Sequence, residues 1–371
     1  MGYRWCTPGW LLGGVGVALI LSACGGPAAP PAGSAGAAPG AAAPGASPPA
    51  PTGGSTASVA AATPARVALK TAYTTATAAF APLLLAADTG LFAEQGLDAE
   101  VLFIGPGQPL LGALTSGEVP IVMAGAPQAI EAGLAGGDYV LLGAVQPYLT
   151  NAIYVAPEIQ RPEDLRGKSV GVSNYGAISH VALRVALEHW GFVEGRDVQV
   201  VRSGGTPETL AAMQSGAIAG GSFSPPQTFR AAELGFRELF DVAATRQEMG
   251  NAAIVSTRRF TREQPDIVER YLKAVAKAIQ VFRHDREAAV AAIMRQSRMD
   301  DRAVAERTWE WFRDKFNADL SISEATVTNN LRMMAPEKPE ALQARPEQFL
   351  DTSFIERLRA SGYFAQLERE G

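Results

Sequence analysis

Residues 98–128 and 197–227 repeat each other, and this repeat limits the possible folds more than any other feature. At a constant offset of 99 positions, nine residues are identical without a gap: Asp98 and Asp197, Val101 and Val200, Gly105 and Gly204, Leu111 and Leu210, Ala113 and Ala212, Ser116 and Ser215, Gly117 and Gly216, Pro127 and Pro226, Gln128 and Gln227. Coincidence is the alternative in a chain rich in alanine and glycine. The matched glycines and prolines lie at expected element ends, where backbone geometry requires them. The repeat therefore predicts two similar halves.

Each copy has the hydrophobic pattern of strand, turn, helix and strand. In the first copy we expect strands at 99–104 and 119–124 on either side of a helix at 110–116. In the second copy, a strand at 198–202 precedes a helix that should begin with Thr206 as N-cap and Pro207 at its first position.

A further strand and helix precede each copy, at 67–89 and at 169–190. This alternation predicts an α/β fold with two similar lobes, each a mostly parallel sheet flanked by helices, and a ligand cleft between the lobes. The stretches 265–282 and 302–316 read as helices of a helical C-terminal region that should pack on the first lobe. We expect lobe I to comprise 65–154 and 249–371, and lobe II to comprise 155–248.

The N-terminus has the pattern of an export signal. Arg4 is the only charge ahead of an apolar run at 10–20, and Leu21, Ser22, Ala23 and Cys24 close that run. We interpret 1–23 as a signal peptide that precedes Cys24, with an uncleaved anchor helix as the alternative. Residues 24–64 are almost entirely Gly, Ala, Pro, Ser and Thr, and this composition predicts a disordered tether.

Composition argues against several classes of function. The formal net charge is −5, which gives no electrostatic reason to expect a nucleic-acid partner. The two cysteines are Cys6 in the predicted signal and Cys24, so no catalytic thiol remains in the mature chain. The three histidines form no zinc-binding pair, and His180 reads as a solvated residue on a polar helix stripe with Arg184 and Glu188. We therefore expect no enzyme activity, no metal and no cofactor.

Residues 161–172, together with Gly90, Leu91 and Phe92, resemble the solute-binding proteins of bacterial ABC importers. The resemblance is to the branch for nitrate, sulfonates, taurine and thiamine-pyrimidine precursors, and it covers about residues 65–280. It implies a two-lobe clamp, the periplasmic binding protein fold of type II, that hands a solute to a membrane permease. Ala219 and Gly220 stand where this branch often has an aspartate. Residues 21–24 resemble the bacterial lipoprotein box, which implies that Cys24 carries palmitate-type lipid and anchors the protein outside the cytoplasm.

The ligand site can be predicted from the loops at the carboxyl ends of the expected strands. Six loops should face the cleft, at 73–79, 105–109, 124–128, 173–179, 203–207 and 222–228. They contain no Lys, Arg, Asp or Glu, so we expect a cleft that cannot neutralise the paired charges of an amino acid. The candidate ligand-binding residues are hydroxyls, amides and aromatic rings: Tyr73, Thr74, Thr75, Gln108, Gln128, Ser173, Asn174, Tyr175, Thr206, Ser222 and Phe223.

Two ligand types fit such a cleft. A small anion could rest on helix N-termini, or a neutral heterocycle could stack between Tyr73, Tyr175 and Phe223. The expected protein is a monomer that captures one of these solutes for an ABC permease. The alternative is a membrane-tethered domain that senses the same ligand and signals to a partner protein.

Overall fold

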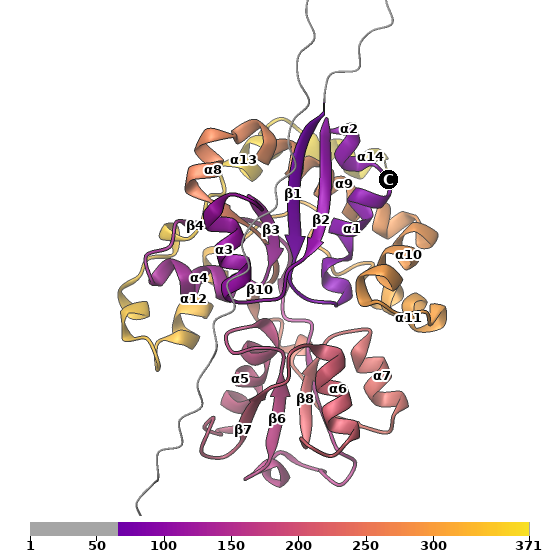
Figure 1. The fold of residues 1–371 in the computed structure, drawn as a ribbon, viewed down its shortest axis with the longest axis vertical. Coiled ribbons are helices and arrows are strands. Elements are labelled where there is room, and N and C mark those ends of the chain that lie inside the picture. The colour runs from indigo at the N-terminus through magenta and orange to yellow at the C-terminus, as the bar shows by residue number, and fades with distance from the viewer. Residues whose placement is uncertain (1–65, 371) are drawn as a thin grey trace, which may run out of the picture. The chain divides into compact units, whose positions relative to one another are not determined.

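The computed structural model describes residues 66–370, and these form two lobes, each built on one five-stranded sheet (Figure 1). The predicted signal peptide, Cys24 and the tether lie outside the described residues. Lobe I has the strand order β2-β1-β3-β10-β4, with β1 (Val67–Tyr73), β2 (Leu97–Phe103), β3 (Ile121–Ala124), β4 (Tyr139–Tyr148) and β10 (Glu248–Thr257). Lobe II has the order β7-β6-β8-β5-β9, with β5 (Ala152–Val155), β6 (Ser169–Val172), β7 (Gln199–Arg202), β8 (Gly220–Phe223) and β9 (Arg237–Asp241).

The two sheets have the same topology, which confirms the predicted fold of two similar lobes. In each sheet three neighbouring strands are parallel, and the two remaining strands run antiparallel to their neighbours. β3 and β8 begin and end 99 positions apart, as the internal repeat predicts. The repeat is therefore structural, and its glycine and proline matches mark equivalent turns.

Helices cover both faces of each sheet (Figure 1). In lobe I the helices before the crossover to lobe II are α1 (Ala81–Asp88), α2 (Leu91–Glu94), α3 (Gln108–Ser116) and α4 (Ala126–Leu134). Lobe II contains α5 (Ile178–Trp190), α6 (Thr206–Gln214) and α7 (Gln227–Glu233). The C-terminal region adds α8 (Arg258–Glu263), α9 (Pro265–His284), α10 (Arg286–Ser297), α11 (Arg302–Phe312), α12 (Glu324–Met334), α13 (Ser353–Ala360) and α14 (Tyr363–Glu370). None of the helices within residues 66–370 is long and apolar enough to span a membrane.

The C-terminal helices complete the core of lobe I. Tyr271, Phe282 and Phe312 are fully buried in the same hydrophobic cluster as Leu83 of α1 and Ile254 of β10. α12 reaches further, because Met333 packs into the main hydrophobic cluster of lobe II. The expected packing of the C-terminal region on the first lobe is confirmed, and α12 also brings this region against lobe II.

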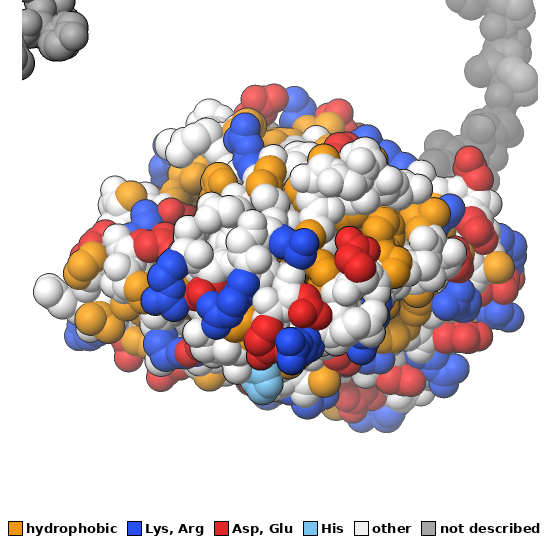
Figure 2. All heavy atoms as spheres, turned by 90° about the horizontal axis from the view of Figure 1, so that it is seen from below, with side chains coloured by type: hydrophobic (Ala, Val, Ile, Leu, Met, Phe, Trp, Pro, Cys, Tyr) orange, Lys and Arg blue, Asp and Glu red, His pale blue; other side chains and the backbone are white. Residues whose placement is uncertain are grey.

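The chain passes between the sheets twice, at 149–151 between β4 and β5 and at 242–247 between β9 and β10. These crossovers lie within a few residues of the predicted boundaries at 154 and 249, and the division into two lobes at those boundaries stays a prediction. Lobe II forms the lower part of Figure 1, and its far end carries acidic and basic side chains side by side (Figure 2).

Candidate functional site

A cavity of about 390 Å³ lies between the lobes, and we call it the Arg298 cavity. Its lining comes from the loops after β1 and β2 and the end of α10 in lobe I, and from the loops after β6 and β7 and the start of α6 in lobe II: Thr74, Thr75, Ala76, Phe103, Gly105, Pro106, Ser173, Gly204, Gly205, Thr206, Pro207, Glu208, Ser297 and Arg298. The carboxyl ends of parallel strands in both sheets thus converge on one space, which is where open α/β folds bind ligands.

Two residues that line this cavity have a buried side-chain hydroxyl with no hydrogen-bond partner within the described part of the chain. These hydroxyls are Oγ1 of Thr206 and Oγ of Ser297, and their residues are only 4% and 6% exposed. A buried polar group without a partner is costly, so native proteins leave few of them. One hydroxyl comes from each lobe, and both belong to residues that line the same cavity.

Arg298 is held at the cavity by a strained backbone. It ends α10 in the left-handed conformation, with φ 50° and ψ 51°. This conformation is uncommon for a residue other than glycine and is associated with functional sites. Gln296, two residues before Arg298, is fully buried and donates from Nε2 to the Thr75 carbonyl at 2.7 Å, which ties the end of α10 to the loop after β1.

Aromatic rings lie beside the Arg298 guanidinium. Its Cζ atom is 4.9 Å from the centre of the Phe103 ring, and Phe103 lies 5.3 Å from the ring of Tyr73. Burial raises the pKa of the Tyr73 phenol, an effect that the charges of Arg298 and Arg295 oppose. Arg295 forms an ion pair with Asp88, whereas Arg298 takes part in no ion pair with any residue in the range 66–370.

The structure brings some of the predicted site residues together. Thr74, Thr75, Ser173 and Thr206 line the Arg298 cavity, and Tyr73 ends the strand beside it. Asn174 lies at the rim, where its Nδ2 donates to the Pro106 carbonyl of lobe I at 3.3 Å.

Other predicted site residues do not reach this cavity. Gln108 is exposed at the start of α3, and Gln128 is buried within α4. Ser222 is buried and accepts a hydrogen bond from Asn151. Phe223 is fully buried against Tyr154 in the lobe II core, and Tyr175 is 55% exposed with its hydroxyl bonded to the Val200 carbonyl. The aromatic sandwich predicted from Tyr73, Tyr175 and Phe223 is therefore not assembled in this structure.

Two predictions about the cleft need correction. The cavity is not free of charged residues, because Arg298 from the C-terminal region and Glu208 from α6 both line it. Sequence reasoning missed them because it considered only the loops that directly follow strands. In addition, Gly205 rather than Thr206 is the N-cap of α6, so Pro207 is the second helical residue, and the Thr206 hydroxyl has no partner among residues 66–370.

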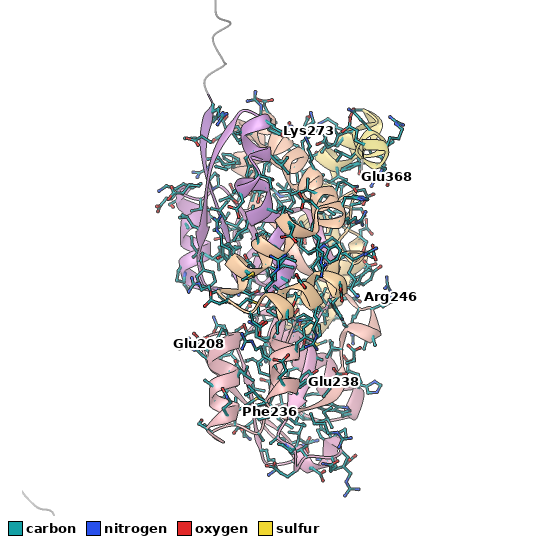
Figure 3. The ribbon with its side chains drawn as sticks, turned by 90° about the vertical axis from the view of Figure 1, so that its right-hand side faces the viewer. Glu208, Phe236, Glu238, Arg246, Lys273 and Glu368 are labelled. Carbon is teal, nitrogen blue, oxygen red and sulfur yellow. The ribbon has the colours of Figure 1, made fainter. Side chains whose placement is uncertain are left out.

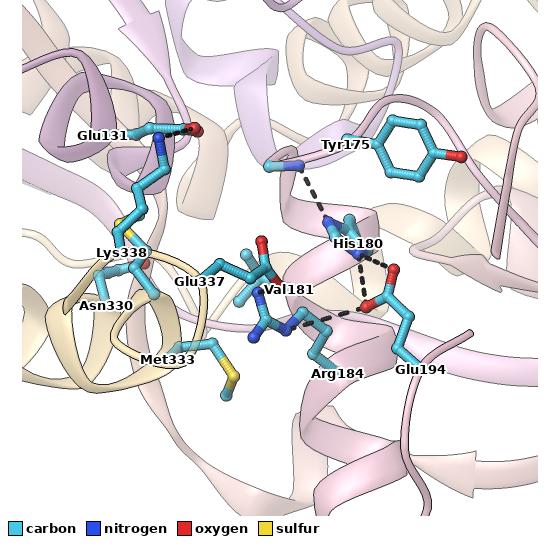
Figure 4. A pocket seen from close by; sticks show the side chains of 12 residues that line it. Glu131, Tyr175, His180, Val181, Arg184, Glu194, Asn330, Met333, Glu337 and Lys338 are labelled. Carbon is cyan, nitrogen blue, oxygen red and sulfur yellow. Dashed lines mark hydrogen bonds and ion pairs between the residues drawn. The ribbon is translucent and has the colours of Figure 1, made fainter. Parts of the chain in front are cut away.

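A second cavity, of about 370 Å³, lies between α5 of lobe II and α4 and α12 of lobe I, and we call it the His180 cavity (Figure 4). His180 is 5% exposed, which corrects the predicted solvated position. Its Nδ1 accepts from the Gly176 N–H at 3.0 Å, and its Nε2 lies 3.0 Å from the Glu194 carboxylate.

The charged groups around the His180 cavity already have partners. Arg184 pairs with Glu337 at 3.0 Å, and Lys338 pairs with Glu131 at 2.9 Å (Figure 4). The Arg298 cavity is the better candidate for a solute site, because within residues 66–370 its Arg298 contacts the aromatic residues Tyr73 and Phe103 and forms no ion pair, and two of its residues have buried hydroxyls without a partner. Within residues 66–370, no group of three or more His, Cys, Asp or Glu side chains could hold a metal ion.

The family model described as NMT1/THI5 like matches residues 77–289, which is more than half of the chain. The chain belongs to the NMT1/THI5-like family. The matched range of this family member includes every strand except β1 and ends in the first turn of α10, so it contains the lobe II part of the Arg298 cavity and the loop after β2. The loop after β1, at 74–76, and the end of α10, with Ser297 and Arg298, lie outside it. No curated protein matches the chain.

Several solved structures share the fold of this NMT1/THI5-like protein. A protein from Bordetella bronchiseptica RB50 is similar with a TM-score of 0.71 and 18% identity, over 80% of this chain and 98% of that one. The alkanesulfonate-binding protein SsuA from Xanthomonas axonopodis pv. citri, bound to MOPS, has a TM-score of 0.62 and 21% identity, over 77% and 96% of the two chains. The periplasmic nitrate-binding protein NrtA from Synechocystis PCC 6803 has a TM-score of 0.63 and 14% identity, over 80% and 89%.

Proposed function

We propose that this protein captures a small anionic solute in the Arg298 cavity and delivers it to the permease of an ABC importer. The observation that carries the proposal is the cavity itself, which is lined by both lobes and contains, within the described residues, a guanidinium that forms no ion pair and one residue from each lobe whose buried hydroxyl has no partner. Membership of the NMT1/THI5-like family and the fold shared with sulfonate- and nitrate-binding proteins support a solute-binding role.

The site chemistry favours an anion over a neutral heterocycle. An arginine provides charge-assisted hydrogen bonds in a planar arrangement that matches sulfonate or carboxylate oxygens. A heterocycle would need the stacking surface of Phe223, which is buried in the lobe II core.

Capture follows from contacts with both lobes. A solute that bonds Arg298 and Ser297 in lobe I and Thr206 in lobe II is held best when the lobes are close together, so binding favours the closed form. A permease could then recognise the closed form. We propose that the protein acts as a monomer outside the cytoplasm, anchored to the cell membrane through lipid on Cys24, and that it has no enzyme activity.

Isothermal titration calorimetry with methanesulfonate, longer alkanesulfonates and nitrate tests the proposal. We expect at least one anion to bind at a ratio of one to one, and Arg298→Gln to weaken that binding by 10-fold or more, because a charge-assisted hydrogen bond is worth about 1.5–3 kcal/mol. Arg270→Gln is the matched control, since Arg270 pairs with Asp266 on α9, away from the cavity. Equal affinity in the wild type and Arg298→Gln would reject Arg298 as the anion site.

The role in transport needs its own test. Stimulation of a permease ATPase by the solute-loaded protein would support delivery, whereas co-purification with a signalling protein would support the sensing alternative. Turnover of the bound solute would contradict the proposed absence of enzyme activity.

A further inference from the structure

The loop 173–177 joins β6 to α5 and borders both cavities between the lobes. Ser173 lines the Arg298 cavity, whereas Tyr175 and Gly176 line the His180 cavity. The loop therefore lies where lobe II meets lobe I, and Figure 3 shows this boundary from the side, with Glu208 of α6 at the lobe II edge of it. A change in the conformation of the loop would alter both cavities at once.

Two contacts fit the loop to lobe I. Asn174 donates from Nδ2 to the Pro106 carbonyl at 3.3 Å, and its Oδ1 accepts from the Tyr175 N–H at 3.1 Å. Gly176 has the left-handed conformation, with φ 72°, and a Cβ atom there would lie 2.8 Å from Oε2 of Glu131 on α4. Lobe I thus comes close to the backbone at Gly176, so closure of the cleft needs this shape of the loop.

His180 holds the loop in this shape through a hydrogen bond with a fixed direction. The Gly176 N–H donates to Nδ1 of His180 at 3.0 Å (Figure 4). A backbone N–H can only donate, so Nδ1 carries no proton. Nε2 therefore carries the ring proton, and it lies 3.0 Å from both carboxylate oxygens of Glu194. The hydrogen bond to the loop exists only while the imidazole is neutral.

A second proton on His180 would break the hydrogen bond to the loop. Nδ1–H and the Gly176 N–H would then be two donors that face each other. Histidine is the side chain whose charge changes between about pH 5 and about pH 8, so mild acid brings about this change. The imidazolium would keep its contact with Glu194 as an ion pair.

The other charged and titratable groups around the His180 cavity have partners of their own. They come from α4, from α5, from the loop 173–177 and from the segment after α12: Glu131, Arg184, Tyr175, Glu337 and Lys338. Arg184 pairs with Glu337 and lies 4.0 Å from Glu194, Lys338 pairs with Glu131, and the Tyr175 hydroxyl donates to the Val200 carbonyl. Within residues 66–370, the His180 ring is hydrogen-bonded to Glu194 and the Gly176 backbone alone.

We infer that His180 is a positioning residue for the loop 173–177 and makes solute capture depend on pH. The neutral imidazole holds the loop in the shape that contacts lobe I, and the imidazolium releases it. This inference rests on the proposed capture of a solute in the Arg298 cavity. Binding of a proton at His180 and binding of the solute then oppose each other, so the solute should bind more weakly in mild acid and should release protons when it binds.

Calorimetry on the full chain at two pH values tests the inference. Methanesulfonate, longer alkanesulfonates and nitrate stay ionised in this range, so their own titration cannot cause a pH dependence. We expect the affinity of the wild type for the anion that binds it to fall by about 3-fold or more between about pH 7.5 and about pH 5.5, as the loss of about one hydrogen bond would give. Binding near pH 6.5, measured in two buffers of different ionisation enthalpy, should release a fraction of a proton.

Two histidine variants of α5 give the comparison. His180→Asn places an amide oxygen where Nδ1 lies and cannot gain a proton, so its affinity should stay constant within about 2-fold over the same range. His189→Asn is the matched control, because His189 is exposed on the same helix and lines neither cavity. This variant should keep the pH dependence of the wild type.

Hydrogen exchange of the Gly176 amide, measured by NMR without any solute, tests the role of His180 separately. The protection factor corrects for the intrinsic effect of pH on exchange. We expect the wild type to lose protection at Gly176 between about pH 7.5 and about pH 5.5, and His180→Asn to keep it.

The possible results separate the two proposals. Anion binding with the same affinity at both pH values would overturn the inference and leave anion capture intact. A pH dependence that persists in His180→Asn, or that disappears in His189→Asn, would also overturn it, because another group would then be responsible. If none of the anions binds, anion capture is rejected and the Gly176 amide decides on its own: equal protection at both pH values overturns the role of His180, and protection lost only in the wild type supports it. The wild-type measurements do not depend on the folding of any variant.

Discussion

Asn174 of lobe II donates a hydrogen bond from Nδ2 to the Pro106 carbonyl of lobe I, with a distance of 3.3 Å. Pro106 lines the Arg298 cavity, and Asn174 directly follows Ser173, which lines it from the other side. The contact therefore bridges the two lobes at the rim of the candidate site. It exists only while the lobes are close together, so it contributes to the stability of the closed form.

We predict that Asn174→Ala weakens solute binding by about 2- to 10-fold, because a typical hydrogen bond contributes about 0.5–1.5 kcal/mol. Calorimetry with the solute that binds the wild type measures the change. Gln108→Ala is the control, since Gln108 is exposed and does not line the cavity. Unchanged affinity in Asn174→Ala would mean that this contact has no part in closure.

Two glycines allow a matched test of packing in lobe I. A Cβ atom on Gly143 would lie 2.6 Å from the backbone oxygen of Leu320, whereas a Cβ atom on Gly112 would meet nothing within 4 Å. We predict that Gly143→Ala destabilises the protein by about 1–3 kcal/mol, because backbone must move. Gly112→Ala should stabilise it by about 0.5–1 kcal/mol, because Gly112 lies inside α3. Denaturant unfolding of both variants gives the comparison, and a stable Gly143→Ala would show that the segment around Leu320 can shift.

Acid should destabilise the protein partly through Glu194. Burial on its own raises the pKa of this carboxyl, but the hydrogen bond from His180 and the charge of Arg184 outweigh burial and hold the pKa below its usual value. A carboxyl with a lowered folded-state pKa stabilises the protein above its unfolded pKa of about 4.3 and loses that contribution as pH falls through the folded value. We therefore predict that Glu194→Gln lowers the melting temperature at pH 7 and that the deficit shrinks below about pH 4. A deficit that stays constant from pH 7 to pH 3 would contradict this assignment.

The ion pair between Arg307 of α11 and Glu233 of α7 joins the lobes at a distance of 2.9 Å, and its side chains are 51% and 44% exposed. Exposed ion pairs contribute little, so a double-mutant cycle with Arg307→Ala and Glu233→Ala should give a coupling below about 1 kcal/mol. The coupling should decrease further at 1 M salt, where screening is strong. A coupling of several kcal/mol that resists salt would show that this pair fixes the arrangement of the lobes.

The sequence predicted the fold well because the fold depends on local patterns. The sequence predicts that β3 corresponds to β8 and α3 to α6. This prediction uses the hydrophobic period, the turn residues and the offset of 99 positions, and all three can be read directly from the sequence. The candidate site was predicted only in part. Thr74, Thr75, Ser173 and Thr206 follow strands directly, so topology places them at the cavity.

The charged residues of the site could not be found in the same way. Arg298 reaches the cavity because α10 packs on α1 and Gln296 is tied to Thr75, and this is a tertiary arrangement between segments more than 200 positions apart. The His180 cavity likewise depends on α12, which comes about 150 positions later in the chain and lines the cavity opposite α5. Such long-range contacts leave no pattern in the nearby sequence. The left-handed conformation of Arg298, a residue other than glycine, is seen only in the structure.

A crystal structure of the protein with its bound solute tests the central claim most directly. Native mass spectrometry of protein purified under mild conditions would first identify a trapped solute by its mass. The account predicts that this solute lies in the Arg298 cavity, with an anionic group bonded to Arg298 and polar contacts to Ser297 in lobe I and Thr206 in lobe II. A solute found in the His180 cavity, or one that contacts a single lobe only, would contradict it.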